Sequence, residues 1–349
     1  MTLHVKSPFQ VVKRSTKVAL RVQFTRGVSS NHVLRRAFGD AYMRREKCKA
    51  RHTSILRQVR LVPLIGADEE GTFMTDITVI ILTKDEEKHI GRCLERLLPL
   101  EPKRVVVIDC FSSDRTREIA LSWNAKWETD VGGKVEVVEH EWPGQHSTQV
   151  NWALDNCNID TEWVLRLDAD EYLMPETCEE VKSILADLPA EITSLSMERS
   201  HIFYGRMISH GGTSRMPMIR FFRRRCGRCE DRAMDEHIVT SEGRDMPLKG
   251  LFVDHNLNDL RWWTEKHLGY ARREAVDAVN GEQFKRAKGW YYRLPPFIRP
   301  FLYFVWRYVV RLGFFDGKAG FLWHFLQGWW YRTIVDVEIA KLKNARVGK

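Results

Sequence analysis

Four apolar runs, each followed by a polar stretch with helical character, constrain the fold of this chain more than any other feature. Strands that are apolar throughout, with no alternation, are typical of parallel sheets covered by helices on both faces. The sequence therefore predicts an α/β fold. The expected helices cover 86–98, 114–124 and 145–157. The four runs are ITVIIL (77–82), RVVVID (104–109), KVEVVEH (134–140) and EWVLRLD (162–168).

Polar clusters follow each of these runs. Parallel strands end at one edge of their sheet, and ligands of open α/β sheets bind at that edge, so we expect the clusters to converge on one crevice. Further strands are expected within 194–205, 216–225 and 248–256, and a helix over 259–279. The clusters read TKDEE (83–87), DCFSSD (109–114), EHEWPGQ (139–145) and DADE (168–171).

The last cluster carries the most chemistry, because WVLRL (163–167) leads directly into the carboxylates of Asp168, Asp170 and Glu171. Acids grouped at the end of a buried strand repel one another unless a cation lies among them. Hard divalent cations prefer oxygen ligands, and Asp-x-Asp at a strand end directs two carboxylates outward from one edge. The sequence therefore predicts a Mg²⁺ or Mn²⁺ site here.

Three segments, in this order, resemble family 2 glycosyltransferases of the GT-A fold: ITVIILTKDEEKHIGRCLERL, VVVIDCFSSDRT and WVLRLDADE. The resemblance covers roughly residues 76–280 and is closest to the branch of lipopolysaccharide-core β-glucosyltransferases. It implies a Rossmann-like, mostly parallel sheet flanked by helices that binds a nucleoside-diphosphate sugar, with UDP as the expected nucleotide. It also implies inverting transfer by single displacement, with a divalent metal stabilising the diphosphate leaving group.

The resemblance assigns donor-binding roles to the first two strand ends. Thr83, Asp85 and Glu86 match the segment that contacts the base and ribose in such enzymes, although Lys84 stands where the family often has an aromatic residue. Asp109 matches the acid that hydrogen-bonds the base, and the alternative for Asp109 is a turn acid before the next helix.

The family's DxD motif matches the acid cluster. Asp170 then corresponds to the metal ligand, and Asp168 to the acid near ribose and metal. His255 matches a histidine after the last core strand that could ligate the metal or contact the diphosphate, with a structural role as the alternative. Gln149 and Asn151, on the helix before the motif, are expected to position the donor or to lie on the helix surface.

Transfer also requires a base that removes the proton of the acceptor hydroxyl. The stretch EDRAMDEHIV (230–239) resembles the region that carries an acidic pair in the same branch, and we assign Glu236 as base with Asp235 as second choice. The alternative is that both acids pair with the arginines of 223–225. Lys266 and His267 match a Lys-His pattern of that branch on a helix that faces the acceptor or packs on the sheet.

The net charge of +9 is unevenly distributed. Residues 1–60 hold fifteen Lys and Arg against Asp40 and Glu46, whereas 61–349 hold forty against forty-four acids. Residues 1–73 are therefore interpreted as a basic, poorly ordered extension that is dispensable or wrongly assigned, with Met74 as the expected true start. A nucleic-acid arm is the rival interpretation, although nucleic acid is not the expected partner of the main domain.

Seven cysteines, odd in number and scattered, are typical of reduced thiols in a cytoplasmic protein. Cys226 and Cys229 form a single CxxC, for which loop thiols are the leading interpretation. A zinc site that also uses His201 or His210 is the alternative.

The C-terminal part, 281–349, contains the most aromatic stretch of the chain, 290–333. Its apolar runs are interrupted by Arg299, Arg307 and Arg311, so no segment of about 20 apolar residues is available to span a bilayer. The pattern predicts helices lying in the headgroup region of an anionic membrane, with Arg307 and Arg311 reaching phosphates. Packing of these helices on the catalytic domain is the alternative.

Together these features predict three parts: the extension 1–73, a GT-A domain over 74–280 and the helical segment 281–349. We expect an enzyme that transfers a sugar to a saccharide or polyprenyl-linked saccharide in bacterial envelope or exopolysaccharide synthesis. Its expected location is peripheral, on the cytoplasmic face of the inner membrane. The rival hypotheses are a catalytically silent membrane-associated partner and a nucleic-acid-binding protein.

Overall fold

The computed structural model describes residues 74–212, 216–231, 237–280 and 289–347, together with four short strands nearer the N-terminus. Contacts divide the chain into two compact units, Met1–Phe73 and Met74–Lys349. In the first unit the pairs are antiparallel: β1 (Val12–Lys13) with β2 (Thr16–Lys17), and β3 (Gln23–Arg26) with β4 (Arg57–Arg60).

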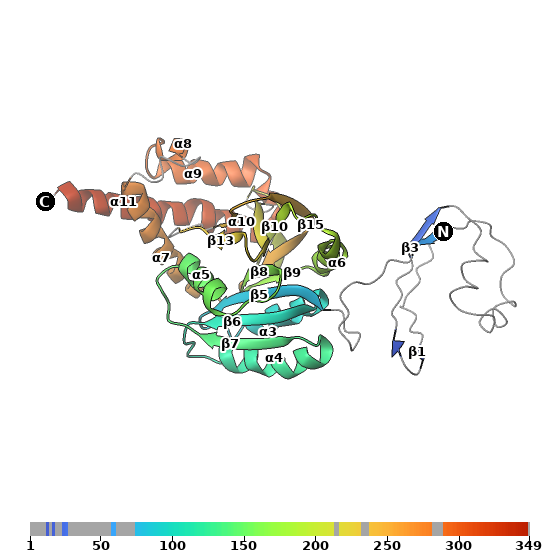
Figure 1. Cartoon of the computed structure of the whole chain (residues 1–349). Helices are drawn as coiled ribbons and strands as arrows, with labels where there is room; N and C mark the ends of the chain where they lie inside the picture. Colours follow the sequence, from blue (N-terminus) through green and yellow to red (C-terminus); the bar gives the residue numbers. More distant parts are fainter. Residues whose placement is uncertain are drawn as a thin grey trace. The chain divides into compact units, whose positions relative to one another are not determined.

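One mixed sheet forms the centre of the second unit (Figure 1). Its strands lie in the order β7, β6, β5, β8, β12, β10, β15 and β9, and β11 pairs with β10 outside this row. The first four are mutually parallel, which confirms the predicted α/β class with its parallel core. Their bounds are β5 (Thr75–Thr83), β6 (Pro102–Asp109), β7 (Lys134–Glu139), β8 (Trp163–Asp168), β9 (Glu171–Leu173), β10 (Ile192–Phe203), β11 (Arg206–Ile208), β12 (Met216–Arg223) and β15 (Arg244–Asp254).

The pairing directions bring distant strand ends to one edge of this sheet. Because β5, β6 and β8 are parallel, their last residues, Thr83, Asp109 and Asp168, share that edge. Strand β12 is antiparallel to both β8 and β10, so β10 runs in the same direction as β8, and β15 is parallel to β10. His201 of β10 and Asp254 of β15, which are register partners, therefore reach the same edge.

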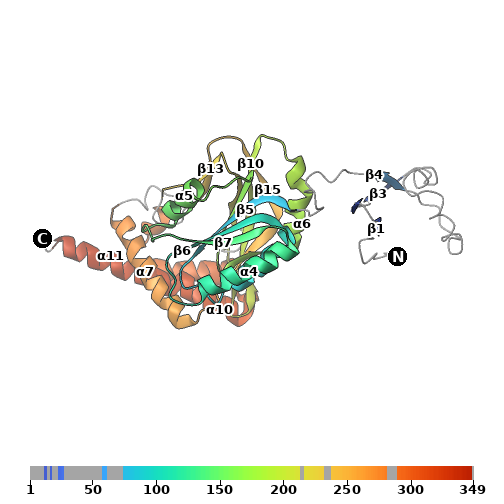
Figure 2. The ribbon, with the colours of Figure 1, turned by 60° about the horizontal axis from the view of Figure 1, so that its bottom comes forward.

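Helices cover both faces of the parallel half (Figure 2). Ile77, Val79 and Ile81 of β5 are buried on the face covered by α3, α4 and α6, whereas Ile80 is buried on the face covered by α5. Side chains alternate along a strand, so two covered faces require an apolar residue at every position. The helices are α3 (Ile90–Leu97), α4 (Thr116–Asp130), α5 (His146–Asn156) and α6 (Pro175–Ile184).

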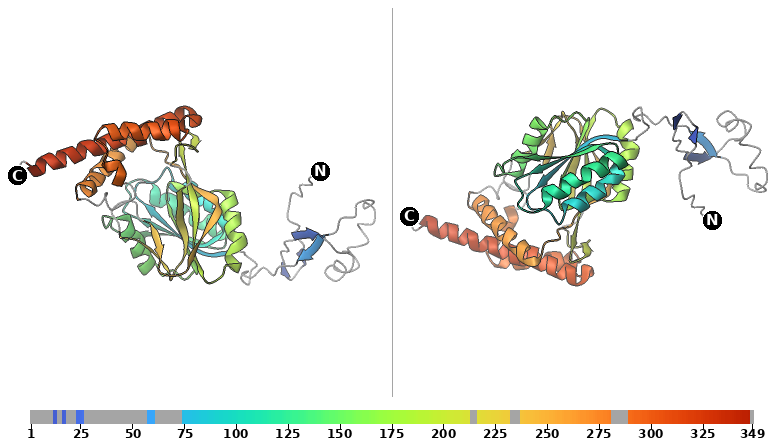
Figure 3. Two further views of the ribbon diagram at one scale, coloured as in Figure 1. Left: turned by 90° about the horizontal axis from the view of Figure 1, so that it is seen from above. Right: turned by 90° about the horizontal axis from the view of Figure 1, so that it is seen from below.

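The C-terminal helices lie together on one side of the sheet, beside α7 (Figure 3). Helix α11 packs on α7 through a core that includes Ala271, Ala275 and Val335. Helix α10 packs on β11, where Trp323 contacts the cluster around Ile208. The elements are α7 (Leu260–Val279), α8 (Gly289–Tyr292), α9 (Ile298–Val305), η4 (Trp306–Val310), η5 (Gly313–Asp316), α10 (Gly317–His324), η6 (Phe325–Trp330) and α11 (Tyr331–Val347).

The outward role predicted for Arg307 is wrong. Arg307 is buried, and its guanidinium lies over the ring of Tyr303 at 5.5 Å. It lies in η4, a π-helical turn that continues α9 and changes the phase of the helix surface. Arg299 is also buried, in an ion pair with Asp336 of α11. Within the part of the chain that the structure describes, no helix is both long and apolar enough to cross a bilayer.

Candidate active site at the carboxyl ends of the strands

The ends of β5 and β6 are joined by a network around Asp109. This residue is fully buried. Its carboxylate accepts hydrogen bonds from the backbone N–H and the hydroxyl of Ser112, at 2.8 and 2.6 Å, and from the Thr83 hydroxyl at 3.0 Å. These contacts are those of a turn acid, the alternative that the sequence left open for Asp109. A role in recognising the base stays a prediction.

Asp85 and Glu86 lie in the loop between β5 and α3. Asp85 adopts a left-handed backbone conformation, with φ 55°, and its Oδ1 accepts from the backbone N–H of Ser113 at 2.7 Å. Lys84 donates to the carbonyl of Phe111 at 2.7 Å. The two loops that the resemblance assigns to the nucleotide are therefore bonded directly to each other.

Glu86 is part of a second connection, through His89. The Nε2 of His89 accepts a hydrogen bond from the backbone N–H of Leu257 at 2.8 Å, so Nδ1 carries the proton and donates to Glu86 at 2.5 Å. His89 is fully buried. The pKa of Glu86 is raised by burial, while its bond with His89 acts in the opposite direction. The contacts tie the loop after β5 to the loop after β15.

Four carboxylates gather where β8, β9 and β15 meet: Asp168, Asp170, Glu171 and Asp254. Glu171 is the register partner of Asp254 across the β9–β15 pair. Burial raises the pKa values of Glu171 and Asp254, and Asp170 and Asp168 raise them further by repulsion. The surrounding protein therefore does not stabilise all four carboxylates in their charged form.

Buried arginines balance part of this charge. Arg220 of β12 pairs with Glu171 at 2.5 Å, and Arg166 of β8 pairs with Asp168 at 2.9 Å. Burial acts to raise the pKa of Asp168, but Arg166 and Arg220 outweigh it, so the pKa is lowered and Asp168 stays charged. Asp168 is also accessible, with 34% of its side chain exposed.

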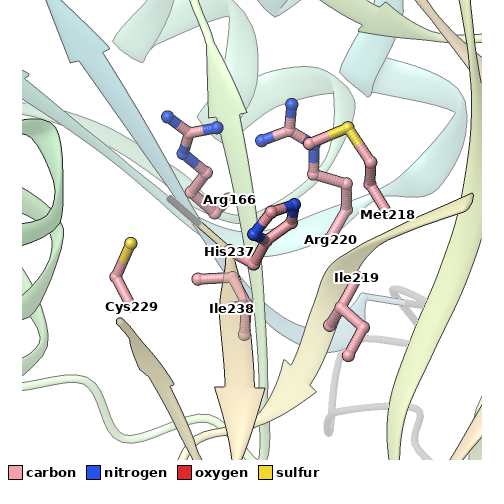
Figure 4. A pocket seen from close by; sticks show the side chains of 7 residues that line it. All are labelled: Arg166, Met218, Ile219, Arg220, Cys229, His237 and Ile238. Atoms are coloured by element: carbon pink, nitrogen blue, oxygen red, sulfur yellow. The ribbon is translucent and has the colours of Figure 1, made fainter. Parts of the chain in front are cut away.

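Both arginines line a pocket next to the acids (Figure 4). Cys229 of β13 (Gly227–Cys229) and Ile238 of β14 (Ile238–Thr240) also line this pocket, together with His237, the residue before β14. The His237 Nδ1 lies 2.8 Å from Glu230 Oε1. The predicted bases, Asp235 and Glu236, lie outside the described residues.

His255 is held in one tautomer by Arg92 of α3. Arg92 donates to His255 Nδ1 at 3.1 Å and to the backbone carbonyls of His255 and Asp170. An arginine cannot accept a hydrogen bond, so Nδ1 is the acceptor and Nε2 carries the proton of the neutral ring. Burial and then the charge of Arg92 lower the pKa of His255. In this tautomer Nε2–H suits a hydrogen bond to a phosphate oxygen better than a metal.

The predicted ligands fit a cation that arrives with phosphate. Among the described residues, no three His, Cys, Asp or Glu side chains are grouped closely enough to hold a metal by themselves. Mg²⁺ commonly takes one or two carboxylates, with water and substrate phosphates completing its shell. Asp168 is accessible, and Asp170 uses Oδ2 to accept from Asn256 at 2.9 Å. These oxygen donors suit a hard cation, which would offset charge on a diphosphate.

Gln149 and Asn151 both contact protein groups. Gln149 is fully buried on α5, where its Oε1 lies 2.7 Å from His140 Nδ1 and its Nε2 contacts the Cys110 sulfur at 3.2 Å. Asn151 clamps the backbone of Cys229, donating to its carbonyl at 2.8 Å and accepting from its N–H at 3.0 Å. Their contribution to donor binding stays a prediction.

The remaining candidates divide between the site and the scaffold. Lys266 lies over the ring of Trp262 at 4.5 Å. Burial acts to lower its pKa, but Tyr270, Asp170 and Glu86 outweigh burial and raise it. His267 instead stacks on Trp263, with ring centroids 3.5 Å apart. Cys226 and Cys229 are buried, and no group of metal ligands forms around them within the described ranges.

Sequence reasoning missed the buried ionic partners of the site. Arg166 and Arg220 lie inside apolar strand segments, and Asp254 precedes the histidine that drew attention. The one sequence signal for these partners was an arginine within an otherwise apolar strand, because a buried charged side chain requires a partner of opposite charge.

Residues 78–234 match the family model of glycosyl transferase family 2. An uncharacterized glycosyltransferase of Rickettsia typhi is 34% identical over 113 residues, which cover 32% of this chain and 34% of that protein. A TPR repeat-containing protein of Synechococcus elongatus is 30% identical over 115 residues, 33% of this chain and 25% of the relative. The chain thus spans about a third or less of the length of these relatives.

Two solved structures are also similar. S. aureus TarS in complex with UDP-GlcNAc aligns with a TM-score of 0.40 and 16% identity, over 78% of this chain and 92% of that one. The mannosyltransferase PcManGT from Pyrobaculum calidifontis, in complex with GDP-Man and Mn²⁺, aligns with a TM-score of 0.40 and 18% identity. That alignment covers 78% of this chain and 76% of the other.

Proposed function

We propose that this protein is an inverting, metal-dependent glycosyltransferase that uses a nucleoside-diphosphate sugar, with UDP as the favoured nucleotide. The acceptor is a saccharide or a lipid-linked saccharide in envelope or exopolysaccharide synthesis. Inversion follows from a single displacement, which needs one base and one stabilised leaving group and no protein nucleophile.

The acid cluster at the converging strand ends carries this proposal. Asp168 and Asp170 lie at the edge where the family 2 segment ends its strands, and the cluster holds two further acids whose pKa values are raised by burial and repulsion. A divalent cation bound with a diphosphate relieves that repulsion and withdraws charge from the leaving group. Asp168 and Asp170 would hold the cation, and the Nε2–H of His255 and the ammonium of Lys266 suit the diphosphate.

The first test is calorimetric titration with UDP and GDP, each with and without Mn²⁺. We expect Mn²⁺-dependent binding of UDP. Asp170→Asn removes the charge but keeps an oxygen that accepts from Asn256, so the loop is retained while metal-dependent affinity falls by about tenfold or more. Asp187→Asn, at an exposed acid on η2 (Leu185–Asp187), is the matched control.

Each outcome of that titration has one meaning. Loss of Mn²⁺-dependent binding in Asp170→Asn alone supports the site. Equal binding in both variants contradicts the metal assignment, and binding of neither nucleotide by the unaltered protein contradicts a nucleotide-sugar donor.

We assign Glu236 as the base, with Asp235 as second choice. Support comes from the described neighbour His237, which lines the pocket with Arg166 and Arg220. Glu236→Gln should lower kcat by about 10² to 10⁴ and leave UDP binding unchanged, since a general base acts only in the transfer step. If Asp235→Asn shows that loss and Glu236→Gln does not, the two roles are exchanged.

We further propose that the protein binds the surface of an anionic membrane through its C-terminal helices. Large apolar side chains are exposed there along one stripe of α9 and η4 and on the neighbouring η5 and α10. Exposed apolar patches of this extent mark interaction surfaces, and aromatic side chains favour the membrane interface. The exposed residues include Phe297, Ile298, Phe301, Leu302, Trp306, Val309, Val310, Phe314, Phe315 and Phe321.

A further inference from the structure

A hollow opens between η4 and α10 on the exposed side of the C-terminal helices. Tyr308, Gly317, Lys318, Phe321 and Leu322 line it, and its volume is about 490 Å³. That volume lies within the range of small-molecule sites in proteins. Its walls are mostly apolar, with one ammonium group.

The aromatic walls continue into the exposed apolar stripe. The rings of Tyr308 and Phe321 lie 5.6 Å apart, and that of Phe314 lies 6.3 Å from Tyr308. Phe321 is 44% exposed, and Phe314 42%. A hydrocarbon chain leaving the hollow would therefore stay on apolar surface, whereas a purely polar ligand would leave these rings in contact with water.

Two cationic side chains lie at one end of the hollow. Lys318 is part of its lining, and the guanidinium of Arg206 packs against Gly317, where an added methyl group would lie 3.3 Å from Nη1. Arg206 donates to the carbonyl of Phe315 at 3.0 Å. The nearby Asp316 carboxylate is occupied by His210 and the backbone of Ser209. Within the described part of the chain, neither Lys318 nor Arg206 forms an ion pair.

Strand β10 connects the hairpin that carries Arg206 with the acid cluster. Arg206 is the register partner of Phe203 in the β10–β11 hairpin, and His201, two residues earlier on β10, lies 3.5 Å from Asp254. A strand rises by about 3.3 Å per residue, so the two register positions are separated by roughly 7 Å. A sugar attached to a phosphate at this end could reach the acid cluster.

We propose that this hollow binds a lipid monophosphate, with the hydrocarbon chain along Tyr308, Phe321 and Leu322 and the phosphate at Lys318 and Arg206. The proposal rests on the proposed function and specifies its acceptor as a sugar carried on a lipid phosphate. Charge complementarity and the continuous apolar surface select this ligand over a neutral lipid, which would leave both cations unused.

The test uses farnesyl monophosphate, below its micelle concentration, titrated calorimetrically into the full-length protein without membranes. We expect saturable binding that Lys318→Glu and Phe321→Ala each weaken by about tenfold. Both side chains are exposed, so neither substitution disturbs the core. The matched controls are Lys343→Glu and Leu121→Ala, which change an exposed lysine and an exposed apolar residue on other helices and should leave affinity unchanged.

Competition separates the chemistries of the ligand. Farnesol should bind about tenfold more weakly than its phosphate, and inorganic phosphate should displace the probe only weakly. Equal binding of farnesol, full displacement by inorganic phosphate, or affinity of the two hollow variants equal to that of the unaltered protein would each overturn the proposal. UDP titration of the same samples keeps this proposal distinct from the proposed function. If the protein binds UDP but not farnesyl monophosphate, only the lipid site is contradicted. If it binds farnesyl monophosphate but not UDP, only the donor site is contradicted.

Discussion

At the scale of single residues, Asp109 shows how one side chain joins two donor-site loops. Its carboxylate accepts three hydrogen bonds in a fully buried position, two from Ser112 and one from Thr83. Ser112 in turn accepts from the backbone N–H of Asp85 at 2.8 Å. The loop after β5 therefore depends on Asp109 even without direct contact between Asp109 and a ligand.

Substitutions at Asp109 distinguish the turn role from a ligand role. In Asp109→Asn the hydroxyls of Thr83 and Ser112 can rotate to accept from the new amide, so we expect stability within about 1 kcal/mol of the unaltered protein and unchanged UDP affinity. Asp109→Leu leaves the backbone N–H and the hydroxyl of Ser112 without an acceptor, and the Thr83 hydroxyl with the Ile108 carbonyl alone, so it should lower the free energy of unfolding by about 2–4 kcal/mol. Urea unfolding and UDP titration measure both, and loss of UDP affinity in a stably folded Asp109→Asn would support the predicted base-binding role.

At the scale of elements, the C-terminal helices are fastened to α7 by polar contacts inside apolar surroundings. Glu274 of α7 accepts from the hydroxyls of Tyr292 and Tyr331, at 2.7 Å each, and pairs with Arg332 of α11. His267 of α7 contacts Gln327 of η6 at 3.0 Å. The same helices thus pack on the domain with one side and expose apolar residues on the other.

Glu274→Ala tests this fastening. The substitution leaves the half-buried Arg332 without this carboxylate and removes the acceptor of two tyrosine hydroxyls, so it should lower the free energy of unfolding by about 3–5 kcal/mol. Glu265→Ala on the same helix breaks only the exposed pair with Arg261 and is the control. Chemical unfolding measures both, and equal effects would show that the Glu274 network adds nothing to the attachment of α11.

Lowering the pH should weaken the packing of the C-terminal helices on α7, because His267 of α7 would take up a proton. The pKa of His267 is lowered to about 4, because burial and the nearby Lys266 lower it by more than the bond to the Trp263 carbonyl raises it. Below pH 6.5 the unfolded chain takes up a proton that the folded chain refuses, so this stabilisation is complete above pH 6.5 and is lost as the pH falls towards 4.

The measurement is urea unfolding at pH 7.5 and pH 4.5. We expect the loss between these values to be smaller in His267→Gln by on the order of 2 kcal/mol. Trp263, stacked on His267, supplies a fluorescence signal for the local change. A loss of the same size in the variant and the unaltered protein would exclude His267 as its source.

At the scale of the whole molecule, the exposed apolar stripe should decide membrane binding. Phe301→Ser, Trp306→Ser and Val310→Ser together remove three exposed side chains without touching the contacts of α11 with α7. We expect the triple variant to stop sedimenting with vesicles that contain anionic lipid, because the buried apolar area on binding falls. Leu121→Ser, an exposed residue of α4, is the control, and continued sedimentation of the triple variant would contradict the proposal.

Many of the strands and helices of the domain could be predicted from the sequence, because the patterns that indicate them lie within short segments. Runs such as 77–82 and 104–109 are apolar at every position, which only a strand covered on both faces requires. The expected helix over 259–279 agrees with α7 (Leu260–Val279) to within one residue. Acids placed directly after a strand, as in DADE, indicate a site at that end for the same local reason.

Only the tertiary structure decided which distant groups meet. Arg220 reaches Glu171 because β12 returns antiparallel beside β8, and Asp254 faces Glu171 through the pairing of β15 with β9. The burial of Arg307 depends on a π-helical turn and on which helices cover it, and periodicity alone directed it outward. Local patterns determine which segments form strands and helices, whereas the partner of a buried charge is determined by chain pairings that no local pattern encodes.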